Sequence, residues 1–287
     1  MSALPAVFAA YQRRVTAELE RLMPAGDGPV ERSMAYTALA PSKQVRAVLV
    51  LACAELCRGD VARAVPAAAA IELVHSASLI LDDLPSMDNA PLRRGRPANH
   101  LEFGEAMAIL AAFGLLNLAF GTLAGAYEPP LATRLATVTS DAVGPAGLIG
   151  GQAIDLRSID QQITFEALER IHRGKTGALF VAAATCGALT AGAAAEPIAA
   201  LAAYAKNLGL AFQIVDDLLD VEGDPAQTGK AVREDARKTT FVSFSGVDGA
   251  RQIAAELCET ADRALAPFGA RADHLRDLSA FVAARRQ

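Results

Sequence analysis

Apolar residues recur at helical spacing along nearly the whole chain, and this pattern predicts helices almost everywhere. Alanine and leucine, both good helix formers, dominate the apolar positions. Strand signals are scarce, because β-branched residues are few, aromatic residues make up 5% of the chain, and no hairpin dipeptide separates two alternating runs. The pattern therefore predicts an all-α protein.

Clusters of glycine, proline, serine and aspartate interrupt the helical pattern and predict where helices end. They lie at residues 24–29, 40–42, 85–91, 127–130, 143–147, 222–229 and 245–249. The segments between them form about ten or more helices, with no break long enough to link separate domains. We expect residues 1–287 to form a single all-α domain, a large helical bundle around a central cavity.

Two uncharged windows, residues 106–127 and 176–195, are long enough to span a bilayer. Both consist largely of alanine, glycine and threonine, and Asn117 lies in the middle of the first. Helices that are apolar on all sides are usually buried, so we expect two central helices rather than an integral membrane protein.

Composition and charge exclude some functional classes. Of 287 residues, 52% are apolar, which suffices for a large core, and the net charge of −5 argues against a nucleic-acid-binding protein. The cysteines have no metal-binding spacing, which predicts reduced, mostly buried thiols of a cytoplasmic protein. They are Cys53, Cys57, Cys186 and Cys258. The N-terminal arginines follow the apolar run, which is the wrong order for a secretory signal.

An apolar helix ends in an unusual acidic cluster within "ILDDLPSMD", residues 80–88. Asp82, Asp83 and Asp88 lie where the helix should stop before Pro85. Carboxylates are unfavourable at this end of a helix, because the macrodipole is already negative there. The cluster therefore indicates a site that binds something positive.

The pattern recurs in "IVDDLLD", residues 214–220, which contains Asp216, Asp217 and Asp220. Asp216 and Asp220 share one helix face, and Gln213 lies one turn earlier. The repeated aspartate motif predicts two helices that face each other across a shared cavity. A solvated acidic face explains one such cluster as well as a site does, but two clusters on apolar helices favour a site.

Oxygen ligands without histidine or cysteine suit Mg²⁺, which fills its coordination shell with water and phosphate oxygens. Basic residues accompany both clusters, and arginine and lysine recognise phosphate groups. They are Arg93, Arg94, Lys175, Lys230, Lys238, Lys43 and Arg46. Together these residues predict a diphosphate site. His75, two turns before Asp82 on nearly the same face, is either a structural histidine or part of this site.

The motifs and their order resemble the trans-isoprenyl diphosphate synthases, the family of farnesyl and geranylgeranyl diphosphate synthases. "DDLPSMD" matches the first aspartate-rich motif in its DDxxxxD form, and "DDLLD" matches the second, DDxxD. "LRRGRP", "GGQAIDL", "KTGALF", "FQIVDD" and the stretch from Gly229 to Thr240 follow the family's order. The resemblance covers nearly the entire chain and implies the isoprenoid synthase fold and a homodimer.

The resemblance also implies roles for individual residues. Three Mg²⁺ ions with substrate bound would be ligated by Asp82, Asp88 and Asp216, while Asp83, Asp217 and Asp220 complete the acidic walls. The allylic diphosphate would bind to Arg93, Lys175 and Lys230. Isopentenyl diphosphate would bind to Lys43, Arg46, His75 and Arg94. Thr176 and Gln213 would face the developing carbocation, Phe212 would pack near the isopentenyl tail, and Lys238 would add positive potential.

Some positions depart from the family pattern. Gln44 and Ala47 replace an arginine and a proline of the N-terminal motif, and Arg233 stands where glycine is common. Family members that make farnesyl diphosphate commonly carry Phe or Tyr five residues before the first aspartate, where this chain has Ala77, followed by Ser78. A C20 product is therefore expected, unless bulk from Phe113, Leu116 or Phe120 closes the cavity and gives C15.

The expected reaction is ionisation of the allylic diphosphate, condensation with isopentenyl diphosphate and loss of a proton. A non-catalytic partner subunit would have lost one aspartate motif, and a terpene cyclase would pair its first motif with Asn, Ser and Glu. This chain keeps both aspartate motifs, which favours the enzyme. The basic C-terminal "ARRQ" suggests a further hypothesis, that this end folds over the site when substrate binds.

Overall fold

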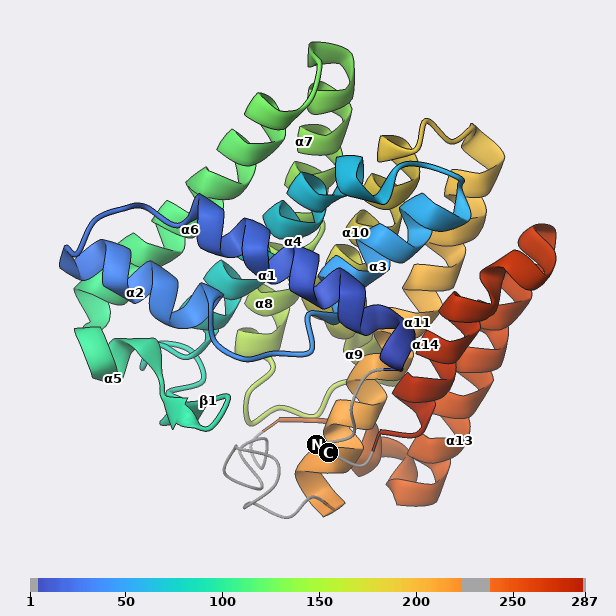
Figure 1. The fold of residues 1–287 in the computed structure, drawn as a ribbon. Helices are drawn as coiled ribbons and strands as arrows, with labels where there is room; N and C mark the ends of the chain where they lie inside the picture. The colour runs from blue at the N-terminus through green and yellow to red at the C-terminus, as the bar shows by residue number, and fades with distance from the viewer. Residues whose placement is uncertain (1–4, 223–237, 286–287) are drawn as a thin grey trace.

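The computed structural model describes residues 5–222 and 238–285, which are almost entirely helical (Figure 1). The α-helices are α1 (Ala9–Leu22), α2 (Pro29–Ala38), α3 (Val45–Leu56), α4 (Val61–Asp82), α5 (Asn99–Phe103), α6 (Glu105–Ala126), α7 (Pro129–Val143), α8 (Leu148–Arg157), α9 (Phe165–His172), α10 (Ala178–Thr190), α11 (Ala195–Glu222), α13 (Phe241–Ala264) and α14 (Asp273–Ala283). Shorter helical segments are η1 (Ala6–Phe8), η2 (Arg173–Gly177) and η3 (Ala266–Ala272). The all-α prediction is confirmed.

Most predicted breaks separate helices in the structure. Residues 24–29, 40–42, 85–91, 127–130 and 143–147 each fall at or between helix ends. The break predicted at 245–249 is also present: within α13 two helical stretches meet at a kink, where Gly246 has a non-helical φ of 71° and ψ of 170°. The chain also turns at Arg58, which takes a left-handed φ of 62° at the end of α3, and no proline marks that turn.

Helix α4 lies inside the bundle, packed against α3, α6 and α10. Its interior proline, Pro66, disturbs the helical hydrogen bonding. The Tyr127 hydroxyl bridges two backbone groups near this proline: it accepts a hydrogen bond from the Ala67 N–H at 3.1 Å and donates one to the Arg63 carbonyl at 2.8 Å. The helix therefore runs on without a break to Asp82.

The two uncharged windows have different surroundings. Helix α10 is buried along most of its length, as predicted. The prediction for residues 106–127 was only half right, because α6 exposes Ile109, Leu110 and Phe113 on its outer face. Helices α4, α6 and α11 are long and apolar enough to cross a membrane, and 67%, 39% and 44% of their most apolar windows are buried.

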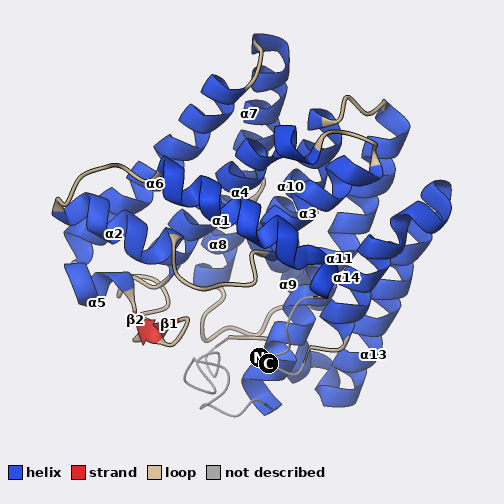
Figure 2. Ribbon diagram, viewed as in Figure 1, coloured by secondary structure: helices blue, strands red, loops and turns tan. Residues whose placement is uncertain are grey.

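A small hairpin follows the first aspartate cluster, although the sequence carries no hairpin dipeptide. Strands β1 (Leu92–Arg93) and β2 (Arg96–Pro97) pair antiparallel (Figure 2). The two turn residues, Arg94 and Gly95, both take left-handed conformations with φ of 55° and 74°, the geometry of a type I′ turn. Arginine in the position that usually holds Asn or Gly hid this hairpin from the sequence pattern.

Candidate active site

The first aspartate cluster forms where α4 ends. The Asp88 N–H donates to the Asp82 carbonyl at 2.9 Å, so the chain turns back on itself and brings the two carboxylates together. The Lys175 ammonium lies 3.2 Å from Asp82 Oδ1 and 3.9 Å from Asp88 Oδ2. Burial lowers the pKa of Lys175, but the surrounding carboxylates outweigh it and raise the pKa overall. The lysine is therefore a fixed positive charge.

Asp155 of α8 completes this cluster, and the sequence analysis gave it no role. Its Oδ2 lies 2.8 Å from Lys175 Nζ and 3.2 Å from Lys238 Nζ, which also reaches Asp88 at 2.6 Å. Burial alone would raise the pKa of Asp155, yet the two ammonium groups lower it. Burial and Asp82 raise the pKa of Asp88. The two lysines thus join carboxylates from α4, its following turn and α8.

Gln152 was also missed. Its side-chain amide donates to Asp82 Oδ1 at 2.6 Å, and it lies three residues before Asp155, hence on the same face of α8. The signal was present in "GGQAIDL", where a glutamine and an aspartate share a helix face. Only the fold shows that this face meets the end of α4.

Asp83 has different surroundings from its neighbour Asp82. It is 2% exposed and accepts from Arg93 Nε at 3.0 and 3.1 Å and from Arg93 Nη2. This forked pair ties the β1–β2 hairpin to the end of α4. Arg93, for which the resemblance implies contact with the allylic diphosphate, is thus anchored beside the first cluster.

The second cluster divides in the same way. Asp216 Oδ1 pairs with Arg285 Nη1 at 2.9 Å, so the C-terminal arginine reaches the site. Asp217 is 3% exposed and accepts from the Phe241 N–H and the Gln213 amide, both at 3.0 Å. Asp220 lies one turn further along α11 and is half-buried. Movement of the C-terminus on substrate binding stays a prediction.

The η2 segment connects the two clusters. It is a single π-helical turn between α9 and α10, a distortion frequent at functional sites. Lys175 reaches Asp82 of α4, while the next residue, Thr176, donates its hydroxyl hydrogen to Gln213 Oε1 of α11 at 2.8 Å. Two neighbouring residues therefore link the ends of both aspartate-bearing helices at one site.

A basic group lies beside this site at the start of α3. Arg46 stacks 4.7 Å from the Phe180 ring centre and 5.8 Å from that of Phe212, and its Nη1 lies 3.3 Å from His75 Nε2. Burial lowers the pKa of Arg46 to about 10. Burial and the neighbouring arginines lower the pKa of His75 well below its ordinary value, which keeps the imidazole neutral.

Lys43 and Arg94 flank this group. The Lys43 ammonium lies 5.5 Å from the Phe281 ring centre, and burial together with Arg285 lowers its pKa to about 8. Arg94 donates to the Thr37 carbonyl at 3.4 Å from the hairpin turn. The role of Lys43, Arg46, His75 and Arg94 in binding isopentenyl diphosphate stays a prediction. Lys230 and Arg233 lie outside the described residues.

The departure at Gln44 has a structural consequence. Gln44 takes a left-handed φ of 49° immediately before α3, and its side-chain amide donates to the Thr16 hydroxyl at 3.1 Å. It therefore ties the start of α3 to α1. Ala47 is fully buried in the core of the bundle.

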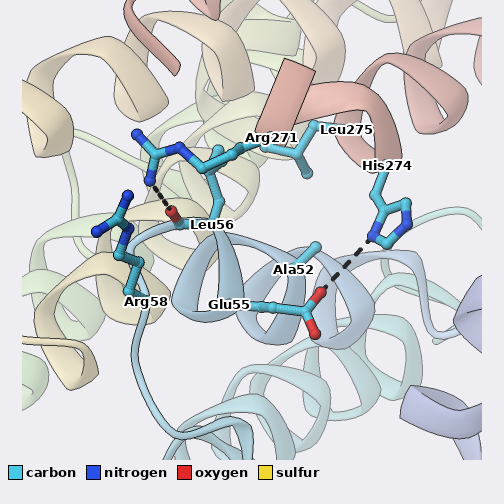
Figure 3. Close-up of a pocket in the computed structure, with 7 residues that line it drawn as sticks. All are labelled: Ala52, Glu55, Leu56, Arg58, Arg271, His274 and Leu275. Atoms are coloured by element: carbon cyan, nitrogen blue, oxygen red, sulfur yellow. Dashed lines mark hydrogen bonds and ion pairs between the residues drawn. The ribbon is translucent and has the colours of Figure 1, made fainter. Parts of the chain in front are cut away.

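A cavity of about 240 Å³ lies elsewhere, at the C-terminal end of α3 (Figure 3). It is lined by Arg58, Arg271, His274 and Glu55 among others, and none of the aspartates of the two clusters borders it. Arg271 caps the carbonyl of Leu56 at 3.3 Å, and Glu55 pairs with His274 at 3.6 Å. At the candidate site, Lys175 and Lys238 lie among the carboxylates of the first cluster and Asp155, and Arg285 lies against Asp216.

The donor set of the candidate site is compatible with Mg²⁺. Cationic side chains already contact Asp82, Asp88 and Asp216, so these carboxylates are directed at positive charge. Among the described residues, no three acidic, histidine or cysteine side chains form a ready metal cluster. Mg²⁺ does not require one, because it binds one or two carboxylates and takes its other ligands from water and phosphate.

The profile of the polyprenyl synthetase family matches residues 28–262. The chain belongs to this family. It is an enzyme that transfers prenyl groups, a trans-prenyltransferase. Geranylgeranyl pyrophosphate synthase 9 of Arabidopsis thaliana is 41% identical over 89% of this chain and 74% of its own. Farnesyl diphosphate synthase of Geobacillus stearothermophilus is 41% identical over 89% of this chain and 88% of its own.

The fold of this prenyltransferase has solved counterparts. The geranyltransferase of Helicobacter pylori, solved in complex with magnesium and isoprenyl diphosphate, superposes with a TM-score of 0.86. It is 29% identical, and the match covers 96% of this chain and 95% of that one. The family and the fold implied by the sequence motifs are therefore confirmed.

Proposed function

We propose that this prenyltransferase condenses isopentenyl diphosphate with an allylic diphosphate, with Mg²⁺ as cofactor, and releases a C20 product. One observation carries the proposal: η2 joins two acidic clusters at a single site, with Lys175 and Lys238 among the carboxylates. A purely structural helical protein has no reason to gather so many buried charges. The magnesium and isoprenyl diphosphate of the Helicobacter pylori relative support the same chemistry.

In this proposal the two clusters and the basic residues divide the binding of substrates. Asp82, Asp88 and Asp216 would hold Mg²⁺, which neutralises diphosphate charge when bound. Lys175, Arg93 and Lys230 would hold the allylic diphosphate. Lys43, Arg46, Arg94 and neutral His75 would hold isopentenyl diphosphate, with Phe212 beside its hydrocarbon part. Lys238 would add positive potential between Asp88 and Asp155.

The reaction breaks the allylic C–O bond, and the bonding electrons leave with the diphosphate. The basic residues stabilise the charge that develops on this leaving group. The double bond of isopentenyl diphosphate then attacks the allylic cation, a C–C bond forms, and the released diphosphate accepts the proton that is lost. Oxygens of Thr176 and Gln213 would face the cation, while the apolar walls keep out water that would convert it to an alcohol.

The C20 product rests on the small residues before the first cluster. Ala77 is buried and presents only a methyl group, and the Ser78 hydroxyl donates to the His75 carbonyl at 2.7 Å. The side chain of Phe113 is 65% exposed on the outer face of α6, so it does not close the cavity of its own chain. Leu116 packs against the core, and with Phe120 it is the alternative that would stop the chain at C15.

We also propose that the enzyme is a homodimer in the cytoplasm, in which the outer face of α6 packs against a second copy. Ile109, Leu110 and Phe113 are 37%, 49% and 65% exposed on that face, and exposed apolar patches of this kind mark interfaces. The measurement is light scattering after gel filtration. Wild type should have twice the chain mass and Phe113→Glu the mass of one chain; a monomeric wild type would refute the proposal.

The decisive experiment is a product assay with Mg²⁺, isopentenyl diphosphate and dimethylallyl, geranyl or farnesyl diphosphate as primer. Products would be dephosphorylated and sized by mass spectrometry, with Asp82→Ala and Asp216→Ala as controls. A C20 alcohol that disappears in both controls supports the proposal, and Ala77→Phe should shorten it to C15. A C15 product from wild type would mean that side chains of another helix limit the length of the cavity, despite the small residues at 77 and 78. No product from any primer would favour a non-catalytic partner subunit.

A further inference from the structure

A buried glutamate, Glu72, lies beneath the basic group that starts α3. It stands on α4, one turn before His75, and is 2% exposed. Its Oε1 lies 3.9 Å from Arg94 Nη2, while its Oε2 is buried with no hydrogen-bond partner among the described residues. A buried carboxylate with so few bonds is costly, so its retention at this point requires an explanation.

The charges around Glu72 supply one. Burial raises the pKa of Glu72, while Arg94, Arg46 and the Ala47 N–H lower it. In return the carboxylate opposes the effect of burial, which lowers the pKa of both arginines; Arg94 and Arg285 lower that of Arg46 further, and Arg93 lowers that of Arg94. Arg93 is already engaged with Asp83. Asp216 also acts on Arg46 and Asp83 on Arg94, but Glu72 is the acidic neighbour common to both.

Both arginines are otherwise loosely held. Arg94 sits in a left-handed turn position, and its bond to the Thr37 carbonyl is long at 3.4 Å. Arg46 is held by aromatic rings and His75, and its Nε has no hydrogen-bond partner among the described residues. Without an acidic group beneath them, the two guanidinium groups would repel each other and lose their common orientation.

We propose that Glu72 is a positioning residue, which holds Arg94 and Arg46 so that both guanidinium groups face the diphosphate of the isopentenyl substrate. This inference rests on the proposed function of that group. Two electrostatic effects oppose each other: Glu72 repels the diphosphate at long range but attracts both arginines, of which Arg94 lies 3.9 Å from its carboxylate. We expect the orienting effect to dominate, because the carboxylate acts most strongly on the guanidinium groups close to it.

The test is calorimetric titration of the full-length protein with isopentenyl diphosphate alone, so that no turnover occurs. Glu72→Gln keeps the shape of the side chain and removes its charge. We expect its dissociation constant for isopentenyl diphosphate to rise about tenfold, about 1.4 kcal/mol. The constant for geranyl diphosphate with Mg²⁺ should stay within twofold. Ser76→Ala, a second buried polar residue on α4, is the matched control and should change neither.

A double-mutant cycle identifies the route of the effect. If Glu72 acts through Arg94, then Glu72→Gln should cost about threefold or less in affinity on an Arg94→Gln background. A full additional tenfold loss would overturn the proposal. So would unchanged or tighter binding of isopentenyl diphosphate by Glu72→Gln, or equal losses for both ligands with a large fall in melting temperature.

The proposed function and this inference fail separately. A wild-type protein that binds isopentenyl diphosphate but forms no prenyl product would refute the proposed function. The affinity loss in Glu72→Gln would still establish the positioning role. A wild-type protein that does not bind isopentenyl diphosphate at all would overturn the inference.

Discussion

The two aspartate pairs, Asp82–Asp83 and Asp216–Asp217, have the same sequence and divide their work in the same way. In each pair the first aspartate meets a cation in the site, and the second is buried where it holds the fold together. Neighbouring residues on a helix point about 100° apart, so the two carboxylates of a pair have different surroundings. We therefore predict that the first aspartate of each pair acts mainly in the site and the second mainly in stability.

The pairs differ in how their charges are balanced. Asp82 shares Lys175 with Asp88 and Asp155 and also accepts from Gln152, and its side chain is 18% exposed. Asp216 pairs with Arg285 from the far end of the chain and is 34% exposed. The first cluster is thus neutralised by residues built into the bundle, whereas the cation seen against Asp216 comes, among the described residues, from near the C-terminus.

The first aspartates should control turnover. Asp82→Asn and Asp216→Asn should each lower kcat by about 10³-fold, because each removes a charge that stabilises the reacting diphosphate. Calorimetric titration with Mg²⁺ and diphosphate should show weaker binding, while melting temperatures change by a few degrees at most. The exposed Asp141→Asn of α7 is the control and should behave as wild type. Activity within tenfold of wild type in either variant would contradict this division of labour.

The second aspartate of the first wall should control stability. Asp83→Asn leaves Arg93 without its forked partner in a poorly exposed position, and breaking such a pair costs about 3–5 kcal/mol. Urea unfolding followed by circular dichroism measures the loss. The double variant Asp83→Asn/Arg93→Met should recover much of it, because the positive charge that Asp83 balanced is removed as well. A single variant as stable as wild type would show that the hairpin is held in another way.

His172 is buried at the end of α9 and should make stability depend on pH. Its ring centre lies 5.2 Å from that of Phe241. Burial lowers the pKa of His172 from 6.5 to about 4; Asp155 raises this pKa, and Lys175 and Lys238 lower it. Between pH 6.5 and 4, His172 is protonated in the unfolded chain but stays neutral in the folded chain. The contribution is therefore fully present above pH 6.5 and is lost as pH falls to 4, by about 3 kcal/mol.

The variant His172→Phe keeps a ring against Phe241 and removes the titration. Its free energy of unfolding, measured in urea at pH 7.5, 6 and 5, should fall less steeply than that of wild type. Carboxylates titrate equally in both proteins, so the difference in slope isolates the histidine. Parallel curves would mean that the folded protein admits the proton.

Local sequence signals predicted the helices and both aspartate clusters, because helical periodicity and motif spacing are properties of short segments. The signals failed where distant segments meet. Nothing near Asp155 shows that α8 meets the end of α4, and nothing near residues 106–127 shows that Ile109, Leu110 and Phe113 of α6 stay exposed. Leu92–Pro97 forms a hairpin with arginine in a turn position that propensity assigns to glycine or asparagine, because Asp83 and Arg93 hold it from outside.

The second aspartate of the second wall provides the smallest effect and the sharpest comparison with Asp83. Among the described residues, Asp217 accepts from a backbone N–H of α13 and from the Gln213 amide, and Asp217→Asn leaves neither of these two neutral donors as an unpaired charge. The expected loss is about 1–2 kcal/mol, the usual cost of an impaired buried hydrogen bond. For a chain of this length the melting temperature should fall by about 2–6 °C. If Asp217→Asn instead costs as much as Asp83→Asn, the partner's charge does not explain the difference between the walls. In that case the shared cause would be burial, since both carboxylates are almost fully enclosed.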